Sequence, residues 1–138
     1  MYKRQLRPLV ERPWPGWTFV LGHFSIYSGG PHGDAEAIQR WFWGDVQPRV
    51  DFYVAGYNHL LEHYQRAGEG TDYVVSGTAG EQDNKDTGRK GPSMAQKRFL
   101  SRAGGFAWFD VTAREVTLRF YDADAVPLYE YRRTRPEE

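Results

Sequence analysis

Two short apolar runs, separated by a helix-like segment, constrain the fold of this chain more than any other feature. The runs cover residues 17–21 and 50–55, and each is followed directly by a glycine. Between them, from Asp34 to Pro48, apolar residues recur at the three-to-four spacing of an amphipathic helix. Strand, helix and strand at this spacing predict a parallel βαβ unit.

The rest of the chain predicts a further strand, a long loop and an antiparallel meander. The strand covers residues 72–76, and the polar loop after it runs from residue 77 to about 102, which is too long for a passive connection. Short turns then separate three strand-like runs, at residues 105–111, 115–121 and 128–133. In the middle run Val116, Leu118 and Phe120 alternate with polar residues. The predicted fold class is mixed α/β, a βαβ unit followed by a meander.

One domain is expected over residues 17–135, with a proline-containing connector at 1–16 and a solvated tail at 136–138. The first five residues, MYKRQ, resemble one translation of a transposase end sequence used in sequencing libraries. Our hypothesis is that the reading frame begins in adapter sequence and that the natural protein extends upstream. The alternative is a genuine short gene, and the genomic sequence before Met1 decides between them.

The composition excludes several classes of function. The 138 residues contain 18 Lys and Arg against 18 Asp and Glu, so no overall field draws the chain to nucleic acid or to an acidic membrane. Without cysteine, neither a disulfide framework nor a thiolate metal site can form. No apolar run approaches the roughly 20 residues of a membrane span. We therefore expect no nucleic-acid partner and no membrane span.

Polar side chains follow three predicted strands where each strand ends. His23 follows the first strand, His59 the second, and Ser76, Gly77 and Thr78 the third. Ligands bind at the carboxyl ends of strands in open α/β sheets, and imidazole is a common metal ligand. One such histidine alone is usually scaffolding, but two at adjacent strand ends indicate a metal site.

Two further histidines have other expected roles. His32 precedes the predicted helix, where it could hold an anion near the helix N-terminus or cap the loop. His63 lies in a strand-like segment and is expected to be structural.

These segments, in this order, resemble the C-terminal half of the purple acid phosphatases, of the small tartrate-resistant kind in the calcineurin-like metallophosphoesterase superfamily. They are WTFVLGHFSIYSGGPHG, a helix, VDFYVAGYNHLLEH, YVVSGTAG and GGFAWFDVTAREVTLRFYDADAVPLYEYR. The resemblance implies half of a four-layer αββα sandwich and a hydrolase acting on phosphate monoesters. It also implies a binuclear centre of Fe with Fe, Zn or Mn in the complete protein. Family members are often secreted or periplasmic.

The resemblance assigns roles residue by residue. His23 matches the histidine of a V-x-x-H motif that binds the second, divalent metal, and His59 matches the last histidine of a G-H-x-H motif that binds iron. His32 matches the histidine that holds the phosphate and assists the leaving group. Tyr57 replaces the first histidine of G-H-x-H and is a doubtful ligand, because a divalent ion prefers imidazole and carboxylate. The rim would be formed by Ser76, Gly77 and Thr78.

The resemblance does not reach the family's N-terminal half, which would carry the D-x-G, G-D-x-x-Y and G-N-H-[DE] motifs. Gly33-Asp34 and Gly44-Asp45 lack the residues that should follow such a Gly-Asp pair. Two-metal hydrolysis needs ions about 4 Å apart that share a bridging ligand. We therefore expect partial or no metal and no activity in this chain alone, with a missing N-terminal half as its partner. Exposed apolar sheet surface should favour self-association.

Two alternatives remain open. One is a non-catalytic binding or interaction module, favoured by Tyr57. The other is a nucleic-acid or surface-binding module built on the basic stretch at residues 89–102, which contains Lys90, Lys97 and Arg98. Such a stretch is usually only a solvated loop.

Overall fold

The structure is a computed structural model that describes residues 3–12, 14–83 and 94–136. Within these ranges the helical elements are α1 (Lys3–Val10), α2 (Glu36–Asp45) and a short 3-10 helix, η1 (Gln47–Arg49). The strands are β1 (Phe19–Leu21), β2 (Phe52–Ala55), β3 (Leu61–Gln65), β4 (Asp72–Ser76), β5 (Gln96–Ser101), β6 (Gly105–Val111), β7 (Glu115–Asp122) and β8 (Pro127–Thr134). Among the described residues, no helix is long and apolar enough to cross a bilayer.

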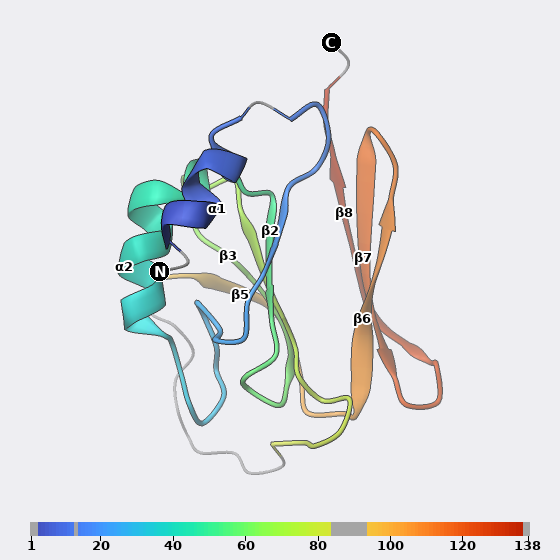
Figure 1. Ribbon diagram of the computed structural model, residues 1–138. Coiled ribbons are helices and arrows are strands. Elements are labelled where there is room, and N and C mark those ends of the chain that lie inside the picture. Colours follow the sequence, from blue (N-terminus) through green and yellow to red (C-terminus); the bar gives the residue numbers. More distant parts are fainter. Residues whose placement is uncertain (1–2, 13, 84–93, 137–138) are drawn as a thin grey trace.

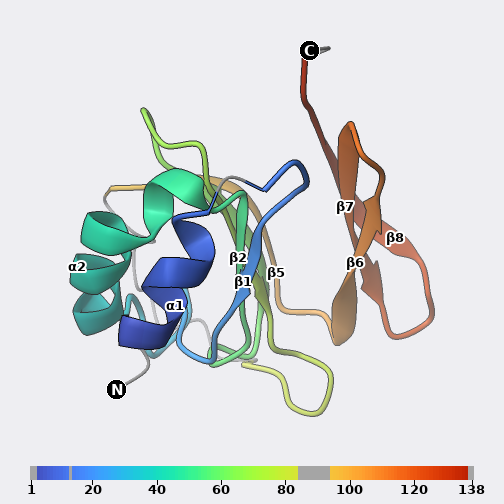
Figure 2. The same ribbon diagram turned by 45° about the horizontal axis from the view of Figure 1, so that its top comes forward.

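The strands form two sheets. In the five-stranded sheet, of order β1-β2-β4-β3-β5, strands β1, β2 and β4 run parallel and β3 runs against its neighbours. The second sheet is the antiparallel meander β6-β7-β8. Helices α1 and α2 lie on one face of the larger sheet and the meander lies on the other, so the layers are helix, sheet and sheet (Figures 1 and 2). The predicted fold class is confirmed.

Side chains alternate between two apolar cores on either side of the larger sheet. In β2, Tyr53 and Ala55 face the helices, whereas Phe52 and Val54 face the meander. The period of two in a strand requires this division. Both faces of the central parallel strands β2 and β4 are therefore buried, which explains their continuous apolar sequence.

The alternation predicted for the middle strand of the meander is also confirmed. Val116, Leu118 and Phe120 of β7 are fully buried against the larger sheet. The opposite face of the meander carries Phe106 and Trp108, which are 41% and 53% exposed. On that outer face Arg119 pairs with Asp110 and Glu130.

The predicted connector before the first strand instead begins with a helix, α1. Pro8 lies inside this helix, which ends two residues later at Val10. Leu6 and Val10 are one turn apart and pack against the helix-side core. This packing outweighs the hydrogen bond that proline cannot donate, and it was not visible from local propensity.

The predicted long loop was wrong at its end, because residues 96–101 form strand β5. Gln96, Lys97 and Arg98 are exposed, so the strand has no clean apolar alternation. Charged residues are common on such edge strands, where they oppose pairing with another chain. Residues 84–93, including Lys90 of the basic stretch, lie outside the described residues.

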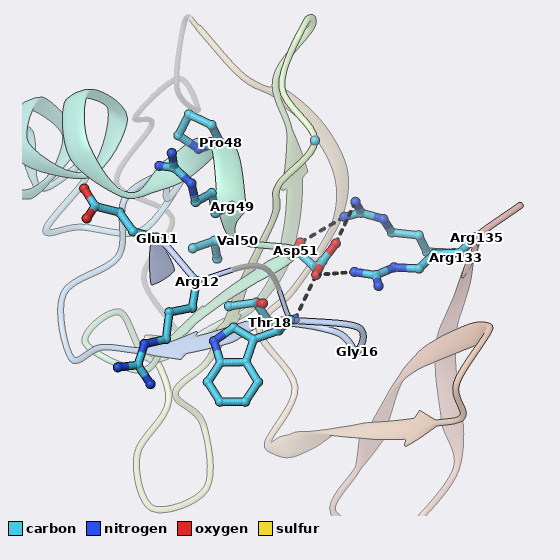
Figure 3. Close-up of a pocket in the computed structure, with 12 residues that line it drawn as sticks. Glu11, Arg12, Gly16, Thr18, Pro48, Arg49, Val50, Asp51, Arg133 and Arg135 are labelled. Carbon is cyan, nitrogen blue, oxygen red and sulfur yellow. Dashed lines mark hydrogen bonds and ion pairs between the residues drawn. The ribbon is translucent and has the colours of Figure 1, made fainter. Parts of the chain in front are cut away.

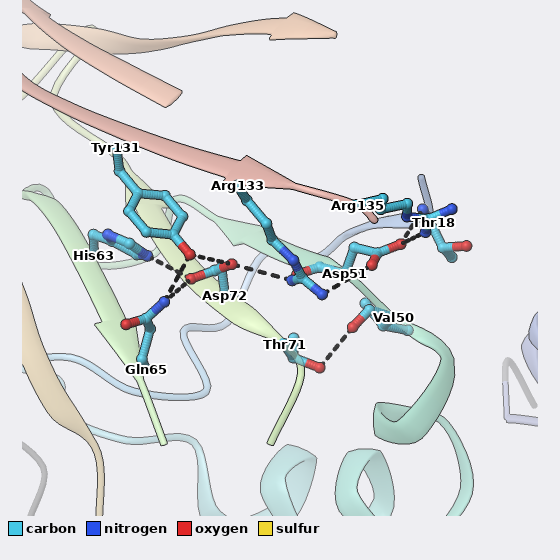
Figure 4. A network of polar contacts seen from close by, with 10 residues as sticks. All are labelled: Thr18, Val50, Asp51, His63, Gln65, Thr71, Asp72, Tyr131, Arg133 and Arg135. Carbon is cyan, nitrogen blue, oxygen red and sulfur yellow. Dashed lines mark hydrogen bonds and ion pairs between the residues drawn. The ribbon is translucent and has the colours of Figure 1, made fainter. Parts of the chain in front are cut away.

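A buried polar network joins the two sheets at the amino ends of the parallel strands (Figure 4). Asp72 of β4 is 2% exposed and accepts hydrogen bonds from Gln65 Nε2 at 2.7 Å and Arg133 Nη1 at 3.1 Å. His63 Nε2 lies 2.8 Å from the same carboxylate, so His63 is structural, as expected. Arg133 also donates through Nη2 to Asp51 at 3.1 Å. One arginine of β8 thus binds carboxylates of β4 and of the residue before β2.

Replacing Arg133 with alanine should lower the free energy of unfolding by about 3 kcal/mol, because the buried Asp72 carboxylate loses its cationic partner. The matched control is Arg132→Ala, since Arg132 pairs with Glu130 on the exposed outer face. Its loss should cost less than about 1 kcal/mol. Urea unfolding of the two variants measures both values. Equal losses would show that the network does not join the sheets.

Candidate functional site

The predicted strand-end residues meet at one edge of the larger sheet. Because β1, β2 and β4 are parallel, the residues that follow them lie at the same end. The first two turns contact each other directly, since the His23 carbonyl accepts from the amides of Gly56 at 3.2 Å and Tyr57 at 2.9 Å. The sequence therefore placed these segments correctly, while their chemical roles stay predictions.

Tyr57 lies among three other rings at this edge. Its ring stacks on that of His32, with centroids 4.4 Å apart and an interplanar angle of 29°. The rings of His23 and Phe24 lie 5.1 Å and 4.9 Å from it. The phenol thus separates two histidines that the sequence assigned to the site, while His23, Phe24 and His32 remain exposed.

His59 faces a different partner, the loop after β4. Its Nδ1 lies 3.8 Å from Glu81 Oε2 and 3.9 Å from Asp83 Oδ1. The backbone amide of His59 donates to Asp83 Oδ2 at 2.8 Å, and the Asp83 amide donates back to the His59 carbonyl at 3.0 Å. These contacts hold two carboxylates beside the imidazole.

The hydroxyls predicted for the rim are engaged with the meander. Ser76 Oγ accepts from the Ala107 amide at 3.0 Å, and the buried Thr78 hydroxyl donates to the Gly105 carbonyl at 3.1 Å. In this arrangement they anchor β6 to the larger sheet. A hollow of about 560 Å³ opens beside Thr78 and is also lined by Glu81, Gln82 and Phe106.

The donors of this chain do not by themselves fit a binuclear centre. In the ranges that the structure describes, no three His, Asp or Glu side chains are arranged to hold a metal ion. The rings of His23, His32 and Tyr57 offer imidazoles and a phenol. The carboxylates of Glu81 and Asp83 lie near His59. Two adjacent cations need shared anionic ligands between them. Further donors would have to come from outside these residues.

Asn58 is a residue that the sequence did not single out, yet it supports the loop that carries His32. Its side chain is fully buried. The side-chain Oδ1 accepts from the His32 amide at 3.1 Å, and Nδ2 donates to Ser25 Oγ and the Gly33 carbonyl, each at 3.4 Å. Asn58 therefore fixes the backbone on both sides of His32.

Two further buried groups hold the same loop. The Tyr53 hydroxyl donates to the Phe24 carbonyl at 2.9 Å, and burial raises the pKa of Tyr53 to about 12, so it remains a donor. Glu62 of β3 binds Ser28 and Gly29. A sequence signal for Glu62 existed, because a charged residue inside the apolar run LLEHY requires a buried partner.

A second hollow lies at the opposite end of the strands (Figure 3). It has a volume of about 400 Å³, and its lining includes Arg12, Arg49, Asp51, Arg133 and Arg135. Asp51 accepts from Arg133, from Arg135 at 2.9 Å and from the Thr18 amide at 2.8 Å. Two of its arginines are thus bound to Asp51, and the hollow forms the outer margin of the network that joins the sheets.

Comparison with known proteins identifies phosphatases as relatives. The chain is 29% identical over 122 residues to purple acid phosphatase 3 of Arabidopsis thaliana, covering 88% of this chain and 33% of that protein. It is 28% identical over 147 residues to human tartrate-resistant acid phosphatase type 5, covering 97% of this chain and 42% of that protein. No protein-family profile matches. The resemblance inferred from the sequence is confirmed, at low identity.

The fold has a counterpart among solved structures. GAP50, described as the anchor in the inner membrane complex of Plasmodium, matches with a TM-score of 0.84 and 15% sequence identity. The match covers 99% of this chain and 42% of that one. At this identity it supports the fold alone, which is consistent with a part of a metallophosphoesterase-type fold. The chain spans only 33% and 42% of the two phosphatases named above.

Gly77→Ala should destabilise the chain by about 2 kcal/mol or more, because a Cβ there meets backbone rather than flexible side chains. It would lie 2.1 Å from the Asn58 carbonyl oxygen and 2.6 Å from that of Gly56. Gly80→Ala is the matched control, because no atom of the described residues lies within 4 Å of a Cβ there. We expect no loss there in thermal unfolding. A neutral Gly77→Ala would contradict this packing of the two turns.

Proposed function

We propose that this chain is part of a binuclear-metal acid phosphatase that hydrolyses phosphate monoesters. The observation that carries the proposal is the meeting of His23, His32 and the turn of His59 at one sheet edge, in a chain whose curated relatives are acid phosphatases. In the complete protein, we propose a centre of iron with iron, zinc or manganese, which would supply an activated water for hydrolysis.

In this proposal each histidine has a separate task. His23 and His59 contribute neutral imidazole nitrogens to metal binding. His32 binds the phosphate and assists departure of the leaving group, and its exposed ring is accessible for both tasks. Ser76, Gly77 and Thr78 shape the rim through the backbone, since the hydroxyls of Ser76 and Thr78 bind the meander. Export from the cytoplasm stays a prediction by analogy with the family.

The proposal includes a missing part of the same domain. The donor set lacks the shared carboxylates of a two-metal centre, and large apolar groups are exposed at sheet margins. Leu21 of the edge strand β1 is 78% exposed, and Trp108 lies on the outer face of the meander. Additional chain that supplies carboxylates and covers these surfaces would complete the domain. This chain alone is then inactive.

A second candidate is a phosphatase-like module that binds without catalysis. The observation in its favour is the position of Tyr57, whose ring packs between His32 and His23. A phenol there displaces the imidazole that a divalent second site prefers. The two proposals differ in whether the complete protein binds two metals and turns over substrate.

The complete protein, expressed with its upstream coding region, should bind two metal ions per chain and hydrolyse p-nitrophenyl phosphate. His59→Ala should lower both metal content and activity. His32→Ala should retain the metals and lower kcat roughly 10²-fold or more, as for loss of an acid–base group. Arg132→Ala, on the outer face, is the neutral control. An upstream region without aspartate motifs, or a complete protein without activity, would refute the phosphatase proposal.

The same protein distinguishes the second candidate through Tyr57→His. If Tyr57 disables the second site, elemental analysis should show a rise from about one metal per chain to two in the variant. If both proteins hold two metals, Tyr57 is not the defect. If neither gains metal and neither is active, the binding module is the better description.

The exposed sheet margins should make the chain self-associate. We expect species larger than the 16.0 kDa monomer in sedimentation velocity at micromolar concentration. Trp108→Glu should shift the distribution toward monomer, whereas Ala113→Glu, in the exposed turn between β6 and β7, should not. A monomeric wild-type chain with one sharp unfolding transition would contradict the expectation of uncovered apolar surface.

A further inference from the structure

Glu62 is a fully buried carboxyl group that the proposed chemistry does not use. It lies on the helix-facing side of β3, two residues before Tyr64 on the same face. Burying a carboxyl group is unfavourable unless hydrogen bonds compensate it. Three donors converge on Glu62. The Ser28 hydroxyl donates to Oε2 at 2.5 Å, and the Gly29 amide and the Tyr64 hydroxyl donate to Oε1 at 2.8 Å and 2.9 Å.

Two of these donors belong to the loop between β1 and α2, which also carries His32. The Ser28 hydroxyl oxygen accepts from the Gly30 amide at 3.0 Å, and the Ser28 amide donates to Asp34 at 2.9 Å. The loop comes so close to Glu62 that a Cβ on Gly29 would lie 3.1 Å from both the Leu100 side chain and the Tyr64 hydroxyl. One carboxyl group therefore holds the middle of the loop, where the chain packs tightly against β3 and β5.

The other end of the loop is fixed by Asn58, whose side-chain oxygen accepts from the His32 amide. A Cβ on Gly30 would lie 2.5 Å from that same oxygen, so the loop also passes close to Asn58. The points where Glu62 and Asn58 bind the loop are thus only a few residues apart. The backbone before His32 is thus held by Glu62 and that at His32 by Asn58, and the ring of His32 stacks on Tyr57.

We propose that Glu62 is a positioning residue: through Ser28 and Gly29 it holds the loop in the form that places the ring of His32 against Tyr57. Its role in hydrolysis rests on the phosphatase function proposed above, but the structural claim does not. A positioning residue of this kind acts through the loop and does not touch the substrate.

The site suits either protonation state of Glu62. As a carboxylate it accepts all three bonds; as an acid it keeps two on Oε1 and donates from Oε2 to Ser28. The titratable groups that face it are Tyr64 and Asp34. Burial raises the pKa of Glu62, and burial also raises the pKa of Tyr64, which stays a donor. A glutamine can make the same three contacts as the neutral acid.

The test is the NMR signal of the His32 ring in the full 138-residue chain, where stacking on Tyr57 shifts its protons upfield. Tyr57→Leu and His32→Gln identify the signal. Glu62→Ala should move it to the unstacked position, and Glu62→Gln should leave it in place. Leu118→Ala, a buried control between the sheets, should lower stability without moving the signal.

Several outcomes would overturn the proposal. A stacked His32 in Glu62→Ala would do so, and so would a shift in Leu118→Ala as large as that in Glu62→Ala. If Glu62→Ala does not fold, Ser28→Ala replaces it, and an unchanged His32 signal there would overturn the proposal. These readouts do not depend on activity, so they can succeed even where the phosphatase proposal fails.

The pH dependence of stability gives an independent readout. Because the folded pKa of Glu62 is raised, its contribution to stability is complete below the ordinary value near 4.5 and is lost as pH rises through the folded value. Glu62→Gln should therefore have a higher free energy of unfolding than the wild type at neutral pH, and this difference should disappear in acid. A difference in unfolding free energy that does not change with pH would contradict the burial of this carboxyl group.

Discussion

The arrangement of the two sheets depends on the contact between Arg133 and the carboxylates of Asp51 and Asp72. Arg133 and Asp51 are 82 positions apart, and no short-range contact could set their separation. Removing these charges from water is expensive, and His63, Gln65, Thr18 and Arg135 contribute further hydrogen bonds to the same carboxylates. The apolar layer between the sheets gives attraction, whereas this network adds directional contacts between them.

Different kinds of interaction stabilise the two ends of the parallel strands. At the amino ends, ion pairs bind the meander to the larger sheet. At the carboxyl ends, the supports are mostly neutral: an amide on Asn58, a phenol on Tyr53, and backbone carbonyls packed against Gly77. The charged groups there are carboxylates: Glu62 lies beneath the loop that carries His32, and Glu81 and Asp83 lie beside His59.

Periodicity predicted most of the fold because the parallel strands and the meander have strong local patterns. The strands around Phe52 and Leu118 could be placed within a residue or two for that reason. Helix α1 and strand β5 could not, since the first contains Pro8 and the second is a charged edge strand. The strand ends were predicted by topology, but the stacking of Tyr57 on His32 and the approach of Asp83 to His59 depend on loop conformation. No local pattern encodes that.

The outer face of the meander and the joint between the sheets will respond differently to ionic strength. Both use arginine, but Arg119 binds Asp110 and Glu130 where these carboxylates are 57% and 44% exposed. The partners of Arg133 are 13% and 2% exposed. Salt weakens ion pairs between solvent-exposed groups, whereas buried pairs are screened much less. Salt therefore loosens the meander's surface while the joint that orients it stays intact.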